Sequence, residues 1–173
     1  MADPIVIVDY DPRWPEEFAR LRDRAQSAMG ELAVSIEHVG STAVPGLPAK
    51  PVIDMVVVIA SDDDLPEAIE RLEVIGYRAR GDLGVPGREA FAWPEGDARH
   101  HLYVSPITSD ELQAQVRFRD LLVSDPRLAA EYVVLKRELA ARYRDDRPSY
   151  TDGKTDFIAA ALVSSAAEQA KPR

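Results

Sequence analysis

The sequence predicts an α+β fold in which a mixed β-sheet is flanked by helices. Strand-like apolar runs fall within the first 104 residues, and the longest of them covers residues 52–59. From Ser109 onward the apolar residues recur at helical spacing, which predicts a helical C-terminal third. The 173 residues contain no repeat or long linker, so we expect one domain over residues 1–173, with a frayed tail at 168–173.

The N-terminal half is expected to mix strands with two helices. Asp11-Pro12 is a helix-opening pair, and the three acids at positions 62–64 are typical of a helix N-terminus, where they complement the helix dipole. The predicted elements are an extended segment at 5–8, a helix at 15–29, strands at 34–38 and 52–59, a helix at 65–75 and a short strand at 77–80.

The second half begins with a glycine-rich loop at 81–87, whose spacing matches no P-loop. We interpret it as a surface loop that could act as a lid. A hairpin is predicted from strands at 89–93 and 100–104, followed by helices at 110–123 and 125–143. A last helix, capped by Thr151 or Asp152, is expected to end near residue 167.

Composition narrows the classes of function. The net charge is −9, from 30 acidic and 21 basic residues, which argues against nucleic acid as the main partner. There is no cysteine, so disulfides and thiolate chemistry are excluded. No signal-peptide pattern and no apolar run of about 20 residues is present, so we expect a cytoplasmic protein without membrane insertion.

The stretch from residue 36 to residue 59 has the strongest functional pattern. Gly40 allows a tight turn, and the hydroxyls of Ser41 and Thr42 and the free N–H groups of such a turn suit phosphate oxygens. Asp54 interrupts an apolar strand, where an unpaired carboxylate is costly. It must therefore have a partner, either a cation, a metal ion or hydrogen-bond donors.

The segment EHVGSTAVPGLPAKPVIDM resembles the signature of the GrpB family (UPF0157), which is assigned to the nucleotidyltransferase-like fold. The resemblance continues through HHLYV, FRDLL, EYVVLKRELA and YTDGKTDFI, and so covers nearly the whole chain. It implies a central mixed sheet of the nucleotidyltransferase type and a site for a nucleotide or a phosphorylated small molecule.

Enzymes of that fold usually follow a Gly-Ser turn with two carboxylates two residues apart and a third on a later strand, which together hold two Mg²⁺ ions. Gly40-Ser41 matches the turn and Asp54 matches the first carboxylate. Val56 occupies the second position and cannot bind a metal. His101 lies on the strand of the third carboxylate, and Tyr103 departs from the histidine that the resemblance implies there.

A substitute metal site is possible. Asp54 and His101 with either Glu37 or His38 would give mixed nitrogen and oxygen ligands, which suit Mn²⁺ or Zn²⁺ better than Mg²⁺. Glu37 and His38 are neighbours on a strand and point to opposite faces. The alternative is that Glu37, His38 and Asp54 form a polar network that only fixes the loop.

Two lysines are candidates for phosphate contact. Lys50 lies four residues before Asp54 and could neutralise it or reach a phosphate, and Lys154 precedes the last helix. The helical residues Arg117, Arg119 and Lys136 are interpreted as surface or ion-pairing residues, with Arg119 paired to Asp120.

These observations leave catalysis open. If the protein is an enzyme, it transfers a nucleoside monophosphate from a nucleoside triphosphate to a small acceptor, with Asp54 as metal ligand and His101 as ligand or base. The first alternative is a non-catalytic nucleotide-sensing or partner-binding module, since GrpB-like domains also occur behind dephospho-CoA kinase. Hydrolysis of a phosphorylated compound is a third possibility.

Overall fold

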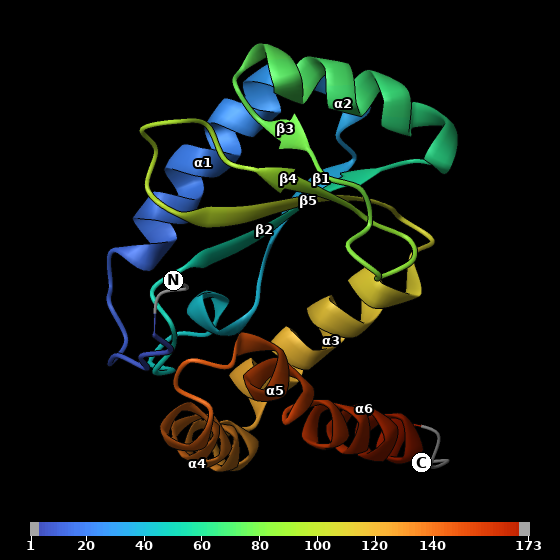
Figure 1. The fold of residues 1–173 in the computed structure, drawn as a ribbon. Coiled ribbons are helices and arrows are strands. Elements are labelled where there is room, and N and C mark those ends of the chain that lie inside the picture. Colours follow the sequence, from blue (N-terminus) through green and yellow to red (C-terminus); the bar gives the residue numbers. More distant parts are fainter. Residues whose placement is uncertain (1–3, 170–173) are drawn as a thin grey trace.

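The computed structural model describes residues 4–169 and has a five-stranded mixed sheet at its centre (Figure 1). The sheet order is β1-β2-β5-β4-β3. Only the central pair, β2 and β5, is parallel, and the other neighbours are antiparallel. The strands are β1 (Ser35–Val39), β2 (Ile53–Ile59), β3 (Arg78–Ala79), β4 (Glu89–Ala92) and β5 (His100–Pro106).

Helices cover both faces of the sheet (Figure 1). On one face lie α1 and α2, and on the other lies α3, with α4, α5 and α6 packed beyond it as the helical third of the chain. The helices are α1 (Trp14–Met29), α2 (Leu65–Val74), α3 (Asp110–Ser124), α4 (Pro126–Arg142), α5 (Arg147–Asp152) and α6 (Thr155–Gln169).

The alternation of side chains along β2 divides the core into two layers. Met55, Val57 and Ile59 face α1 and α2 and belong to the largest buried cluster. Val56 and Val58 face α3. Because both faces of β2 are covered, the strand is apolar almost throughout, as expected for a central parallel strand. Asp54 is tolerated because it lies near the beginning of the strand, where the sheet opens.

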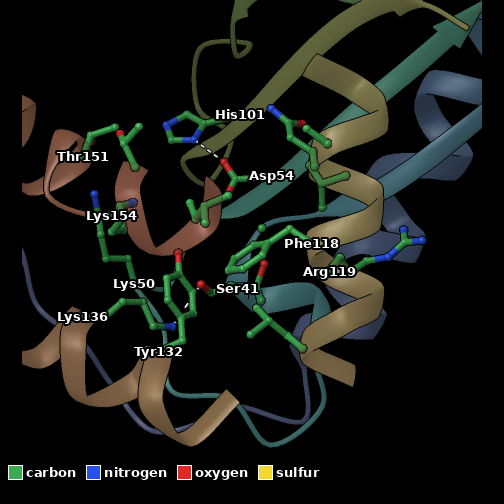
Figure 2. A pocket seen from close by; sticks show the side chains of 18 of the residues that line it. Ser41, Lys50, Asp54, His101, Phe118, Arg119, Tyr132, Lys136, Thr151 and Lys154 are labelled. Atoms are coloured by element: carbon green, nitrogen blue, oxygen red, sulfur yellow. Dashed lines mark hydrogen bonds and ion pairs between the residues drawn. The ribbon is translucent and has the colours of Figure 1, made fainter. Parts of the chain in front are cut away.

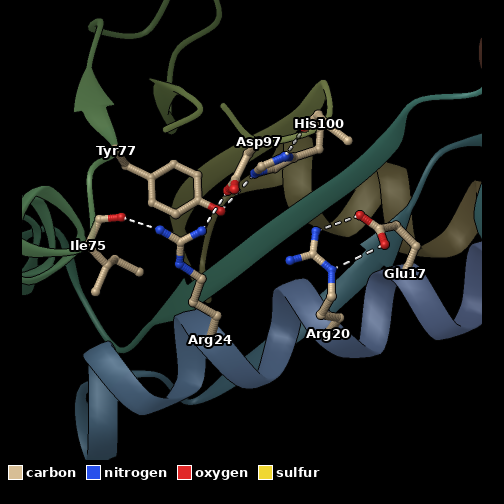
Figure 3. Close-up of polar contacts among 8 residues, drawn as sticks. Glu17, Arg20, Arg24, Ile75, Tyr77, Asp97 and His100 are labelled. Atoms are coloured by element: carbon tan, nitrogen blue, oxygen red, sulfur yellow. Dashed lines mark hydrogen bonds and ion pairs between the residues drawn. The ribbon is translucent and has the colours of Figure 1, made fainter. Parts of the chain in front are cut away.

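A polar cluster on the α1 side holds the loop that connects β4 to β5 (Figure 3). The Tyr77 hydroxyl lies 2.7 Å from His100 Nε2, and His100 Nδ1 lies 2.8 Å from the Ala98 carbonyl oxygen. Since a carbonyl only accepts, Nδ1 carries the proton and Nε2 accepts from Tyr77. Arg24 joins this cluster to α1 through an ion pair of 2.6 Å with Asp97.

The predicted elements are confirmed except near the two ends. Residues 5–8 form only an isolated bridge, from Val8 to Ala49. The last helix is confirmed as α6, but its predicted caps were wrong and the short helix α5 before it was missed. Thr151 and Asp152 lie inside α5, whose N-terminus is capped by Asp146 through the Ser149 N–H. The expected fraying falls partly on residues 170–173, which lie outside the described residues, while α6 continues to Gln169.

No helix among residues 4–169 combines the length and the apolar character needed to cross a membrane.

Candidate functional site

The turn after β1 brings the backbone against Asp54. Gly40 has φ +72° and ψ −173°, a conformation open almost only to glycine. A Cβ atom at this position would lie 2.5 Å from Asp54 Oδ2. Ser41–Ala43 then form one 3-10 turn. The glycine is therefore required both by its dihedral angles and by the carboxylate that lies against it.

Asp54 and His101 are direct neighbours across the parallel pair β2 and β5. His101 Nδ1 lies 2.6 Å from Asp54 Oδ1, and Arg147 Nη2 lies 3.1 Å from His101 Nε2. A carboxylate only accepts and a guanidinium only donates, so Nδ1 carries the proton and Nε2 accepts. The imidazole is thus neutral and its basic nitrogen faces α5. The partner that Asp54 needs is His101.

A cavity of about 560 Å³ opens between the sheet and the helical third, and Asp54 and His101 lie in its wall (Figure 2). This volume is within the range of small-molecule sites. Its apolar wall comes from α3, α4 and α6 and includes Phe118, Tyr132 and Ile158. Two acids and six bases line it: Asp54 and Glu111, against Lys50, Arg88, Arg119, Lys136, Arg147 and Lys154. The cavity is therefore basic in a protein of net charge −9.

Lys136 is buried in the wall of this cavity, with 2% of its surface exposed. Its ammonium donates to the Pro48 carbonyl at 2.6 Å and to Ser41 Oγ at 3.0 Å (Figure 2). Burial lowers the Lys136 pKa to about 7, and the positive charges of Lys154 and Arg137 add to this effect. The interpretation of Lys136 as a surface or ion-pairing residue was wrong.

Lys50 and Lys154 both line the cavity, and both lie near the ring of Tyr150 in α5, while phosphate contact by them stays a prediction. Their ammonium groups lie 5.7 Å and 4.6 Å from the centre of its ring. Burial lowers the pKa of Lys50 to about 8, with further lowering by Arg147, Arg99 and Lys154. Burial also lowers the pKa of Lys154, although the negative charge of Asp54 opposes that shift.

Glu37 and His38 point to opposite faces, and neither contacts Asp54. Glu37 pairs with Arg119 of α3 at 3.0 Å, and Arg119 also pairs with Asp120, as expected. His38 stacks on Phe18 of α1 with 4.4 Å between ring centres.

His38 also joins the turn that follows β1. Its Nε2 lies 3.0 Å from Thr42 Oγ1. Thr42 is itself buried, so its hydroxyl serves this contact with His38. Burial lowers the His38 pKa to about 4, so its ring stays neutral at physiological pH.

The donor set does not fit the two-metal arrangement. Val56, at the second carboxylate position, cannot bind a metal ion, and the residues of β5 on the same sheet face, His101 and Tyr103, are not carboxylates. Within residues 4–169, no three His, Asp or Glu side chains converge on a possible metal position. A divalent ion here would be held by Asp54 together with phosphate oxygens of a ligand, which is a common mode for Mg²⁺.

Three of the cations that line the cavity were not identified as site residues from the sequence. Lys136 lies four residues after Tyr132, on the apolar stripe of α4, and that position was the available signal of burial. Arg147, the first residue of α5, contacts His101 although the two residues are 46 positions apart in the sequence. Arg88 follows the glycine-rich loop and lies over the Tyr103 ring at 4.6 Å. Lid closure by that loop stays a prediction.

Comparison with known proteins gives consistent matches over most of the chain. The family model described as GrpB protein matches residues 4–163. The UPF0157 protein BH1888 of Halalkalibacterium halodurans is 36% identical over 157 residues, which cover 89% of this chain and 78% of that protein. UPF0157 protein YqkA of Bacillus subtilis is 32% identical over 89% of this chain, but the match spans only 45% of YqkA.

Two solved structures show the same fold. GrpB from Enterococcus faecalis superposes with a TM-score of 0.83 at 28% identity, covering 96% of this chain and all of that one. Cid1 in complex with its short product ApU gives a TM-score of 0.59 at 14% identity, covering 85% of this chain and 48% of Cid1. The second likeness concerns the nucleotidyltransferase-like fold alone.

Proposed function

The chain belongs to the GrpB family, and from this premise we propose that it binds a nucleotide or another phosphorylated small molecule in the cavity between the sheet and the helical third. The main support is the convergence of Lys50, Lys136, Arg147 and Lys154 on one cavity beside the Gly40-Ser41 turn. Such a concentration of cations in an acidic protein favours an anionic ligand. The apolar wall suits a base or another flat group.

The fold supports the nucleotide in particular. Cid1 is described with MgGTP bound and with its product ApU, and its nucleotidyltransferase-like fold is shared by this chain. Here Ser41 Oγ and the cations around it would contact the phosphates. Asp54 would face them directly or through a divalent ion, which could be Mg²⁺, Mn²⁺ or Zn²⁺.

We expect calorimetric titration with ATP, GTP, CTP and UTP, each with and without Mg²⁺ or Mn²⁺, to detect binding of at least one nucleotide. Lys154→Met should weaken that binding about 10- to 100-fold, since a hydrogen bond to a charged group contributes roughly 1.5–3 kcal/mol. Arg127→Met is the matched control, because it removes the same charge from an exposed position on α4.

Two results would contradict a nucleotide as the ligand of this cavity. The first is that none of the four nucleotides binds under any metal condition. The second is that Arg127→Met weakens binding as much as Lys154→Met, because the attraction would then reflect net charge rather than a site.

Nucleotidyl transfer is the second candidate, favoured by the Asp54–His101 pair. Asp54 holds the imidazole by its Nδ1–H, so the accepting nitrogen is Nε2, where an acceptor hydroxyl would take the place of Arg147. An acceptor hydroxyl would lose its proton to Nε2 as its oxygen bonds to the α-phosphorus, and pyrophosphate would leave. The non-catalytic alternative needs no such base.

We therefore expect pyrophosphate release when the protein is incubated with the bound nucleotide and a deproteinised small-molecule extract of bacterial cells. His101→Asn should lower the rate about 100-fold or more, the usual contribution of a general base, while nucleotide affinity changes little. If the wild-type protein binds nucleotide but never releases pyrophosphate, the binding-module alternative holds.

A further inference from the structure

Lys136 is a buried cation without a counter-ion. Its ammonium contacts only neutral groups: the Pro48 carbonyl, the Ser41 hydroxyl and the Tyr132 ring, whose centre lies 4.8 Å away. No carboxylate in the described part of the chain forms an ion pair with it. Lysines are rarely buried to this extent unless they are paired.

The charged groups nearest to Lys136 make its situation less favourable. Lys154, from the segment before α6, and Arg137, on α4 itself, are both cations and disfavour a further positive charge. The titratable group beside it on α4 is the Tyr132 phenol, which burial keeps neutral by raising its pKa. Desolvation and two like charges therefore act together, and no carboxylate among residues 4–169 pairs with the ammonium to compensate them.

We propose that the missing counter-ion is a phosphoryl group of the ligand, bound beside Ser41, and that Lys136 takes up a proton when this group binds. The inference rests on the proposed function, since it concerns the same cavity. Ser41 Oγ, which now accepts from the ammonium, lies in the cavity wall where such a group would also contact the lysine. The subsite would thus select ligands with a doubly charged phosphate.

The dependence of ligand affinity on pH follows from the direction in which binding shifts the Lys136 pKa. In the empty protein the Lys136 pKa is about 7, and a bound anion moves it back toward 10.5. Below about pH 7 the lysine is already protonated, so affinity does not depend on this group. Above it, binding must bring in a proton, and affinity falls by up to about tenfold per pH unit until the pKa of the bound state is reached.

The test is calorimetric titration of the full chain with ATP at pH 8, in two buffers that differ in ionisation enthalpy. The terminal phosphate is already doubly ionised there, because its second ionisation lies near pH 6, so any proton taken up comes to the protein. We expect the uptake in the wild type to exceed that in Lys136→Met by about one proton per ATP bound.

Two controls assign this difference to Lys136. Arg127→Met, with the same charge change at the protein surface, should show the wild-type uptake. Lys50→Met should still take up the proton that Lys136 binds when ATP binds, although Lys50 lies in the same cavity and has its own lowered pKa.

Equal proton uptake by the wild type and Lys136→Met, with ATP bound to both, would overturn this inference and leave the proposed function intact. If ATP does not bind to the wild type but another nucleoside triphosphate does, proton uptake by the wild type and Lys136→Met is compared with that nucleotide instead, and equal uptake then overturns the inference. Absence of binding by all four overturns the nucleotide as the ligand and, with it, this inference.

Discussion

Lys136→Met is expected to make the empty protein more stable, by about 1–3 kcal/mol at pH 6. At that pH the buried ammonium is charged and desolvated, and replacing buried charges with apolar residues of similar volume is often stabilising by such amounts. The gain is reduced because the Pro48 carbonyl loses its donor. Urea unfolding of both proteins measures the difference.

The stability advantage of Lys136→Met should shrink as pH rises. Between about pH 7 and 10 the native lysine loses its proton while the unfolded chain keeps it, so the wild type gains up to roughly 1.4 kcal/mol per pH unit. Unfolding at pH 6 and pH 9 therefore checks the sign. A variant that is less stable than the wild type at pH 6, or a difference that does not change with pH, would show that Lys136 is not an uncompensated charge.

Gly40→Ala should lower the free energy of unfolding by about 2–4 kcal/mol. The backbone conformation at Gly40 costs other residues roughly 1–3 kcal/mol, and the new methyl group would press on Asp54, with Cγ and Cβ of that residue 3.2 and 3.3 Å away. Asp54 must move, so its bond to His101 and the nucleotide affinity should weaken as well.

Gly46→Ala is the control for backbone strain. Gly46 also has a positive φ, +78°, but a Cβ atom there would meet nothing within 4 Å. We expect a loss of about 1–2 kcal/mol from the left-handed conformation alone and unchanged nucleotide binding. Equal effects of the two substitutions on stability and on binding would mean that the contact between Gly40 and Asp54 is unimportant.

Local patterns in the sequence were sufficient for most of the fold. Ser109 and Asp125 cap α3 and α4 at the helix starts that the sequence predicts. Such caps can be predicted because the side-chain oxygen bonds to backbone N–H groups only two or three residues further along the chain. The short helix α5 was missed although Asp146 is followed by Pro148, a pair that is typical of a helix start. Gly153, at the C-terminus of α5, does not adopt the left-handed conformation that is common for a glycine after a helix, since its φ is −61°.

The site was predictable where strands form it and not where helices complete it. Alternation placed Asp54, Val56, His101 and Tyr103 on one face, and the β2–β5 register confirms this placement. Sequence alone could not tell which of Glu37 and His38 faces α3, because that depends on how β1 pairs with β2. Lys136 and Arg147 approach the cavity through the packing of α4 and α5, which no local pattern encodes.

The two adjacent histidines at the beginning of β5 have opposite environments, one locked under Tyr77 and one facing the cavity. A slip of β5 by one residue against β2 could place His100 opposite Asp54, but it would carry His101 to the position of Leu102 in the main core and not beneath Tyr77. A histidine beside Asp54 therefore does not by itself fix the alignment of these strands. The following residues fix it, since the same slip would move Leu102 and Val104 out of the main core. Which histidine becomes the site residue is thus decided by apolar side chains that never touch a ligand.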